Sequence, residues 1–137
     1  MREELRLAAT TENLGKVLQL VAEAAAKCGF TEERSNEIQV AAEESFVNIV
    51  RHAYDGDGDC WVECRADGDT VVLTMIDSGV AFDPVAAAAP NTDGAVADRP
   101  IGGLGILLVK QFTDELSYRR EGDTNVLVLT ARRRDKE

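Results

Sequence analysis

The sequence predicts a two-layer α+β sandwich, in which helices cover one face of a mostly antiparallel β-sheet. This follows from the order of the expected elements: a strand, two helices, a hairpin, a long loop, a third helix and a closing hairpin. The first hairpin carries an Asp-Gly turn signal at residues 67–69, and the second is expected to turn at residues 121–123. The chain has no internal repeat and no linker between two cores, so residues 1–137 are expected to form a single domain.

The N-terminal part is expected to contain one strand and two helices. Residues 3–9 alternate between apolar and polar side chains, as in a short strand. Apolar residues recur at helical spacing over residues 12–27, and Gly29 is placed to end that helix. Thr31 is a suitable N-cap for the second helix, which extends towards Ala53.

The C-terminal part is expected to contain two hairpins, a long loop and a third helix. A loop of about twenty residues, rich in Ala, Asp, Pro and Gly, follows the first hairpin, and its length is typical of a lid or a binding loop. The expected strands are residues 60–66, 70–77, 115–121 and 124–132, and the expected helix runs from Gly102 to about Phe112.

The composition limits the partners that the protein can have. A formal net charge of −10 makes nucleic acid and anionic membranes poor partners, because both are polyanions, whereas an acidic surface suits a basic protein partner or solubility alone. No apolar run is long enough to span a bilayer and the N-terminus lacks a signal-peptide pattern, so a cytoplasmic location is expected. Cys28, Cys60 and Cys64 are an odd number without a close pair, which favours reduced thiols over disulfides or a zinc site.

Glu44 and Asn48, on the second expected helix, form the first candidate site. Residues four apart project from nearly the same side of a helix, so a carboxylate and an amide oxygen would lie together. That pair fits a general base beside a ligand for Mg²⁺, which prefers oxygen donors. An exposed polar helix face is the alternative for this pattern taken alone. Glu43 points about 100° away from Glu44 around the helix axis. His52 lies on the same side of the helix as Asn48, and a lone histidine is more often structural than catalytic.

Asp77 closes the second strand of the first hairpin, and Gly79 follows two residues later. A carboxylate at a strand end can accept hydrogen bonds from an exocyclic amine, and a glycine there lets a flat ring approach the backbone. The alternative is a strand that ends in an ordinary Asp-Ser-Gly turn.

Three glycines, Gly102, Gly103 and Gly105, open the third expected helix. Free backbone N–H groups and the helix dipole favour an anion at such a helix start, so a phosphate site is one interpretation and a tight turn is the other. The segment is not a Walker sequence, because no Gly-Lys-Ser/Thr follows the glycines. It is not a dinucleotide fingerprint either, because no βαβ unit surrounds it.

The three signals together resemble the GHKL ATPase superfamily in their order and spacing. The segments V-N-I-V-R-H-A-Y, D-S-G-V-A-F-D-P and R-P-I-G-G-L-G-I most resemble the anti-sigma-factor serine/threonine-protein kinases of the RsbW and SpoIIAB type. The resemblance covers the whole chain and implies the Bergerat ATP-binding fold. The matching motifs are the N box from Glu44 to Asn48, the first glycine box from Asp77 to Pro84, and the second glycine box from Gly102 to Gly105.

The resemblance implies a role for each motif residue. Glu44 would be the general base, and Asn48 would hold Mg²⁺ against the phosphates of ATP. Asp77 would bind the adenine amino group, with Gly79 beside the ring, and residues 83–101 would form the ATP lid. The phosphate-binding residues would be Gly102, Gly103, Leu104 and Gly105.

Kinases of this type bind a sigma factor, phosphorylate a Ser or Thr of a STAS-type anti-anti-sigma partner and are commonly homodimers. The resemblance implies the same partners here. A non-catalytic, ATP-gated binding module of the same fold is the alternative, and the retention of Glu44 and Asn48 favours the enzyme. An ATPase fragment of a larger machine fits less well because no transducer domain follows, and the absence of a histidine-bearing dimerisation helix argues against a sensor histidine kinase. The sequence departs from the wider pattern at Ala81, where many relatives have glycine, and adds Glu43 beside the expected base.

Overall fold

The computed structural model describes residues 2–84 and 102–134 of the protein. The strands are β1 (Arg2–Ala8), β2 (Asp59–Asp67), β3 (Thr70–Asp77), β4 (Glu115–Glu121) and β5 (Thr124–Arg132). The helices are the 3₁₀ turn η1 (Thr11–Asn13) and the α-helices α1 (Leu14–Lys27), α2 (Glu32–His52) and α4 (Gly102–Phe112). Every predicted strand and helix is present, close to its predicted bounds. Of the predicted lid, only Asp83 and Pro84 are among the described residues.

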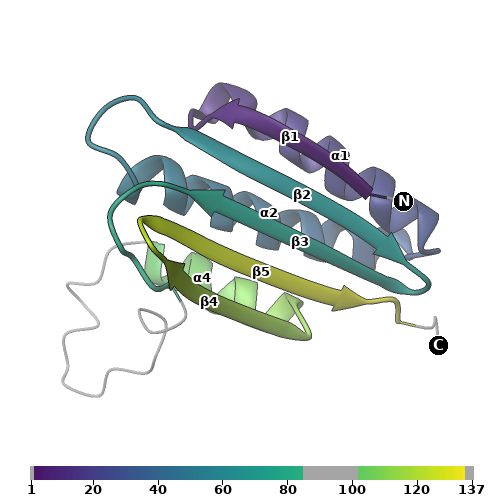
Figure 1. The fold of residues 1–137 in the computed structure, drawn as a ribbon. Helices are drawn as coiled ribbons and strands as arrows, with labels where there is room; N and C mark the ends of the chain where they lie inside the picture. The colour runs from purple at the N-terminus through teal and green to yellow at the C-terminus, as the bar shows by residue number, and fades with distance from the viewer. Residues whose placement is uncertain (1, 85–101, 135–137) are drawn as a thin grey trace, which may run out of the picture.

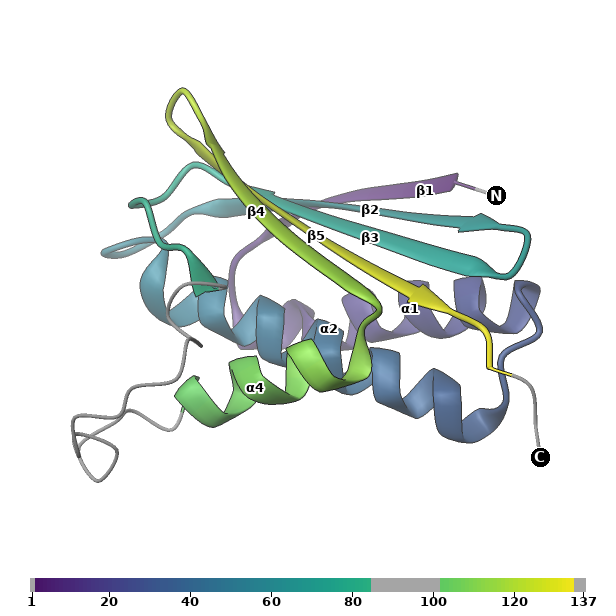
Figure 2. The ribbon, with the colours of Figure 1, turned by 90° about the horizontal axis from the view of Figure 1, so that it is seen from below.

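The five strands form one antiparallel sheet in the order β1-β2-β3-β5-β4, and α1, α2 and α4 lie on one of its faces (Figure 1 and Figure 2). The predicted α+β two-layer sandwich is therefore confirmed. None of the described helices is long and apolar enough to cross a membrane.

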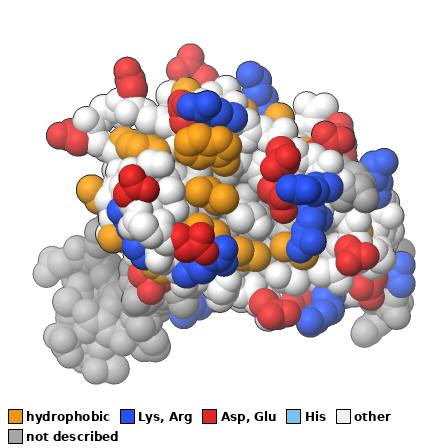
Figure 3. Space-filling model, viewed as in Figure 1, with side chains coloured by type: hydrophobic (Ala, Val, Ile, Leu, Met, Phe, Trp, Pro, Cys, Tyr) orange, Lys and Arg blue, Asp and Glu red, His pale blue; other side chains and the backbone are white. Residues whose placement is uncertain are grey.

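The second face of the sheet carries no helix in the described part of the chain. Apolar side chains gather over the middle of this face, with charged side chains around them (Figure 3). Trp61 is 38% exposed, and the guanidinium of Arg6 lies 4.9 Å above its ring. This face therefore combines an open apolar patch with an edge strand, β1.

Local signals set the ends of the two long helices. Gly29 has a φ of +77°, and the backbone N–H of Phe30 donates to the carbonyl of Ala25, which completes a Schellman stop after α1. At the start of α2, the hydroxyl of Thr31 accepts a hydrogen bond from the backbone N–H of Arg34 at 3.1 Å. Both ends were predicted at these residues.

Arg34 fastens the start of α2 to the other end of the chain. Its side chain is only 2% exposed. The guanidinium donates to the carbonyls of Phe112 at 2.7 Å and Arg132 at 2.9 Å, and to the carboxylate of Asp114 at 2.9 Å. A buried cation with this many acceptors fixes the C-terminal end of α4 against α2.

The helix-facing side of the sheet is apolar until its last row. Cys60 and Met75 are buried there, and the same alternation along β3 brings Asp77 to the core side. The register places Asp77 opposite Cys60 of β2 and opposite Asn125 of β5. A carboxylate and an amide therefore lie side by side at one end of the core.

Candidate functional site

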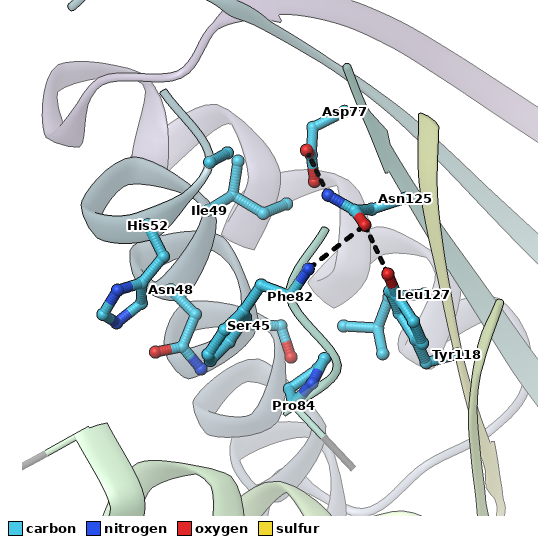
Figure 4. Close-up of a pocket in the computed structure, with 11 residues that line it drawn as sticks. Ser45, Asn48, Ile49, His52, Asp77, Phe82, Pro84, Tyr118, Asn125 and Leu127 are labelled. Atoms are coloured by element: carbon cyan, nitrogen blue, oxygen red, sulfur yellow. Dashed lines mark hydrogen bonds between the residues drawn. The ribbon is translucent and has the colours of Figure 1, made fainter. Parts of the chain in front are cut away.

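A cavity lies where α2 and the segment after β3 meet the β4–β5 hairpin (Figure 4). Its enclosed volume is about 30 Å³, and it opens to solvent. An apolar cavity with a few convergent polar groups is the usual form of a small-molecule site. The described polar residues of its wall are Ser45, Asn48, His52, Asp77, Tyr118 and Asn125, and the apolar ones are Ile49, Ala53, Phe82, Pro84 and Leu127.

Asp77 offers this cavity one free carboxylate oxygen. The residue is only 4% exposed. Its Oδ1 accepts hydrogen bonds from the backbone N–H of Gly79 and from Nδ2 of Asn125, both at 2.9 Å. No described residue donates a hydrogen bond to Oδ2. Because buried acceptors are normally paired, a ligand N–H in the cavity is the group that would complete the site.

Gly79 is required by a close backbone approach. A Cβ built on it would stand 2.0 Å from the carbonyl oxygen of Ala53, and the N–H of Val80 donates to that same oxygen at 2.8 Å. The segment after β3 is thus held against the end of α2. This contact is with the protein's own backbone, so the predicted place of Gly79 beside a bound ring stays a prediction.

Asn48 lines the same cavity from α2, and its side chain is 7% exposed. Its amide makes no hydrogen bond to any other described residue. A buried amide without a partner is costly unless a ligand or water satisfies it. Mg²⁺ coordinates amide oxygens, and water and phosphate can fill its remaining coordination positions. Asn48 therefore fits the predicted Mg²⁺ ligand. The described residues contain no cluster of three or more His, Cys, Asp or Glu that could hold a metal by itself.

Glu44 is half-buried one turn before Asn48 but is not among the described residues that line the cavity. Glu43 is exposed. His52 is exposed and does line the cavity, where its ring stacks on Phe82 with centroids 4.8 Å apart. The structure therefore brings Asn48 and Asp77 to one cavity and leaves Glu44 beside it.

The glycine segment predicted to bind phosphate forms the start of α4, which begins at Gly102 and contains Gly103, Leu104 and Gly105. α4 packs along α2, and its N-terminal end lies at the same end of the molecule as the C-terminal end of α2 (Figure 2). Free backbone N–H groups of a helix start are therefore on the side of the molecule where the cavity lies.

Asn125, Tyr118 and Phe82 are among the cavity-lining residues that the sequence analysis did not single out. One signal was available for Asn125. It occupies a core-facing position in the alternating pattern of β5, where the following core-facing residues are Leu127 and Leu129. A buried amide in an apolar row is a marker of a polar network.

Burial also changes the ionisation of two groups beside Asp77. Desolvation, followed by the nearby charge of Asp77, raises the pKa of Cys60 to about 12. Desolvation raises the pKa of Tyr54 as well. The Tyr54 hydroxyl donates to the carbonyl of Asp59 at 2.6 Å and accepts from the N–H of Ser78 at 2.8 Å. Both groups stay neutral, and Tyr54 ties the loop after α2 to the end of β3.

This fold and cavity define a histidine kinase-like ATPase domain, and residues 7–131 match that family. The serine-protein kinase RsbW of Halalkalibacterium halodurans is 28% identical over 131 residues, which cover 93% of this chain and 80% of the relative. The serine/threonine-protein kinase BtrW of Bordetella bronchiseptica is 32% identical over 96 residues, 69% of this chain and 68% of the relative. RsbW of Listeria innocua is 31% identical over 110 residues, 75% of this chain and 70% of the relative.

A solved structure agrees in fold. The RsbU and RsbW domains of a Mycobacterium tuberculosis protein match with a TM-score of 0.66 at 19% identity, covering 96% of this chain and 32% of that longer chain. The chain therefore belongs to the histidine kinase-like ATPase domain family, among the RsbW-type serine-protein kinases. The recognition made from the sequence motifs is confirmed.

Proposed function

We propose that the protein binds ATP with Mg²⁺ in the described cavity and transfers the γ-phosphoryl group to a Ser or Thr of a STAS-type anti-anti-sigma partner. The observation that carries this proposal is Oδ2 of Asp77, to which no described residue donates, on the wall of a mostly apolar cavity. An oxygen in that setting can accept a hydrogen bond from the exocyclic amine of adenine, and the apolar wall can contact the adenine ring. The chain's membership of a kinase family supports ATP, with its ribose and triphosphate, as the full ligand.

The triphosphate would extend from the base towards the start of α4. There, the backbone of Gly102, Gly103, Leu104 and Gly105 would offer N–H groups to phosphate oxygens. Asn48 would hold Mg²⁺ through its amide oxygen. When bound, Mg²⁺ neutralises charge on the phosphates. Residues 83–101 would close over the nucleotide as a lid.

Phosphoryl transfer breaks the bond between the γ-phosphorus and the ADP oxygen and forms a bond to the hydroxyl oxygen of the partner. The hydroxyl proton must leave, and the carboxylate of Glu44 would accept it. Positioning and charge stabilisation meet most of the barrier of such a step. A general base contributes typically ~10²–10⁴-fold.

In this proposal the protein is a single-domain cytoplasmic regulator that binds a sigma factor and is released from it through a STAS-domain partner. Its relatives named RsbW support this assignment. It would act as a homodimer that pairs through the N-terminal strand. β1 is an edge strand of the sheet, and the exposed Trp61 lies on the open face beside it, which supports pairing in this region.

A second function is an ATP-gated binding module that transfers no phosphate. Glu44, the proposed base, is not among the described residues that line the cavity, so its role in transfer depends on where the triphosphate lies. The two functions differ in what happens to a bound partner. In the module, ATP would change the affinity for the partner and leave its Ser and Thr residues unmodified.

The test is to incubate the protein with candidate STAS-domain partners, with and without ATP and Mg²⁺, and to follow both binding and partner phosphorylation by mass spectrometry. Phosphorylation of one Ser or Thr that requires both ATP and Mg²⁺ is the expected result. A partner that binds in an ATP-dependent way and is never phosphorylated supports the binding module instead. The absence of any ATP binding would overturn both functions.

A further inference from the structure

The side-chain amide of Asn125 uses all of its hydrogen-bonding groups inside the protein. It is 6% exposed and faces the core from β5. Its Nδ2 donates to Oδ1 of Asp77 at 2.9 Å and to the carbonyl of Val80 at 2.8 Å. Its Oδ1 accepts from the hydroxyl of Tyr118 at 2.5 Å (Figure 4) and from a guanidinium nitrogen of Arg120 at 3.2 Å. The amide therefore needs no ligand of its own and acts through its neighbours.

These partners fix which way the amide points. Two acceptors face Nδ2, the carboxylate of Asp77 and the carbonyl of Val80. Arg120, which can only donate, faces Oδ1. Turning the amide by 180° would place N–H against N–H and oxygen against carboxylate. The network thus permits one orientation.

We infer that Asn125 is a positioning residue that sets base specificity, by holding Oδ1 of Asp77 so that Oδ2 alone faces the cavity. This rests on the proposed function, in which the cavity receives the base. Gly79 donates to the same Oδ1, so a quarter turn of the carboxylate would break two hydrogen bonds at once. Oδ2 is thereby kept as a fixed, unoccupied acceptor for one N–H donor of the ligand.

The same amide also holds the cavity wall. Besides bonding Val80, it accepts from the backbone N–H of Phe82 at 3.4 Å, and Arg120 donates in turn to the carbonyl of Gly79 at 2.8 Å. These contacts lie at the base end of the proposed site, and none involves Asn48 or Glu44. Loss of Asn125 should therefore impair recognition of the base and leave the transfer of phosphate intact once nucleotide is bound.

The test compares ATP with purine riboside triphosphate, which differs only in lacking the exocyclic amine. By calorimetry the parent protein should bind ATP about 10- to 100-fold more tightly than the analogue, as expected for one hydrogen bond to a charged acceptor. Asn125→Leu keeps the approximate size of the side chain and removes its polar groups. Its preference for ATP should fall below about threefold, while kcat at saturating ATP stays near the parental value and KM rises.

Two further variants make the result decisive. Threonine suits a strand, and Asn125→Thr retains one hydroxyl donor, so this variant should keep part of the preference for ATP. It also replaces Asn125→Leu in the test if that variant does not fold. Thr130→Val, at an outward-facing position of the same strand, should keep both the affinity and the preference of the parent.

The outcomes separate the two levels of the proposal. If the parent discriminates between the two nucleotides and a folded Asn125→Leu discriminates equally well, Asn125 is not a specificity residue, although the proposed function stands. If Asn125→Thr prefers ATP over the analogue no more than Asn125→Leu does, the inference that a hydrogen-bond donor at this position orients Asp77 is wrong. If the parent binds no ATP, the proposed function itself fails.

Discussion

Gly79 lies so close to Ala53 that a Cβ on the glycine would stand 2.0 Å from the Ala53 carbonyl oxygen. That oxygen already accepts the backbone N–H of Val80 at 2.8 Å. The glycine also donates its own N–H to Asp77. The contact therefore ties the end of α2 to the carboxylate on the cavity wall, and it leaves no space for a side chain.

Substituting Gly79→Ala should lower the free energy of unfolding by about 2 kcal/mol or more, because backbone atoms must move to relieve the overlap. It should weaken ATP binding as well, since the same segment donates to Asp77. Gly15→Ala is the matched control: it lies in α1 with no atom within 4 Å of the new Cβ, and alanine is the better helix former. Urea denaturation of both variants checks this. Equal unfolding midpoints for Gly79→Ala and the parent would refute the packing argument.

Asp77→Asn keeps the shape of the side chain and replaces one of the two oxygens with an amide nitrogen. The remaining oxygen can still accept from Gly79 and Asn125, which turns the new NH₂ group towards the cavity and against the amine of adenine. Calorimetry should show an affinity for ATP at least about tenfold below that of the parent. Asp67→Asn, at the turn of the β2–β3 hairpin, should bind as the parent does. Undiminished binding by Asp77→Asn would remove Asp77 from base recognition.

Arg34→Ala should be among the most destabilising substitutions in the chain. It leaves the carbonyls of Phe112 and Arg132 without a buried donor, and it removes the guanidinium from the carboxylates of Asp114 and Glu37. Breaking a buried ion pair from one side costs about 3–5 kcal/mol. Arg2→Ala removes an exposed ion pair with Glu63 and should leave the urea midpoint unchanged. Similar urea midpoints for the two variants would show that the buried contacts of Arg34 do not stabilise the fold.

The buried thiols predict a pH dependence of stability. Burial raises the pKa values of Cys60 and Cys64 to about 12, whereas an unfolded thiol titrates near about 8.5. Between these values the unfolded chain loses thiol protons that the folded protein keeps. The free energy of unfolding should therefore be constant with respect to these groups below about pH 8 and fall as the pH rises from about 9 towards 12.

Denaturation at a series of pH values checks this, and Cys60→Ala should make the decline shallower. Because the thiolate is the reactive form, folded protein at pH 8 should resist alkylation at Cys60 and Cys64, and urea-unfolded protein should react at both. Rapid alkylation of the folded protein would contradict the burial of these side chains.

The sequence predicted the elements well because their signals are local. The cap at Thr31, the stop at Gly29 and the alternation that ends at Asp77 each depend on a few neighbouring residues. Asn48 and Asp77, which the motif resemblance assigned to one nucleotide site, both line the same cavity. The partnership of Asp77 with Asn125 joins residues 48 positions apart, and only the register of β3 against β5 creates it.

The glycine in the first box shows the same limit. Local reasoning related Gly79 to a bound ring, while its nearest constraint is the carbonyl of Ala53, across the space between the end of α2 and the segment after β3. Helical spacing likewise placed Glu44 near Asn48. It could not say that Glu44 stands outside the described cavity wall, because that depends on how α2 is rotated against the sheet.

Transfer of labelled phosphate from ATP to a bound STAS-domain partner, measured for the parent, Glu44→Gln and Asn48→Ala, tests the kinase assignment most directly. The parent should phosphorylate the partner, and Glu44→Gln should transfer ~10²–10⁴-fold more slowly while ATP and partner binding stay near parental. Asn48→Ala should lose Mg²⁺-dependent ATP binding as well. A parent protein that binds its partner and ATP but transfers no phosphate would contradict the kinase assignment. Transfer by Glu44→Gln at the parental rate would leave a kinase whose base is another residue, with Glu43 the next to substitute.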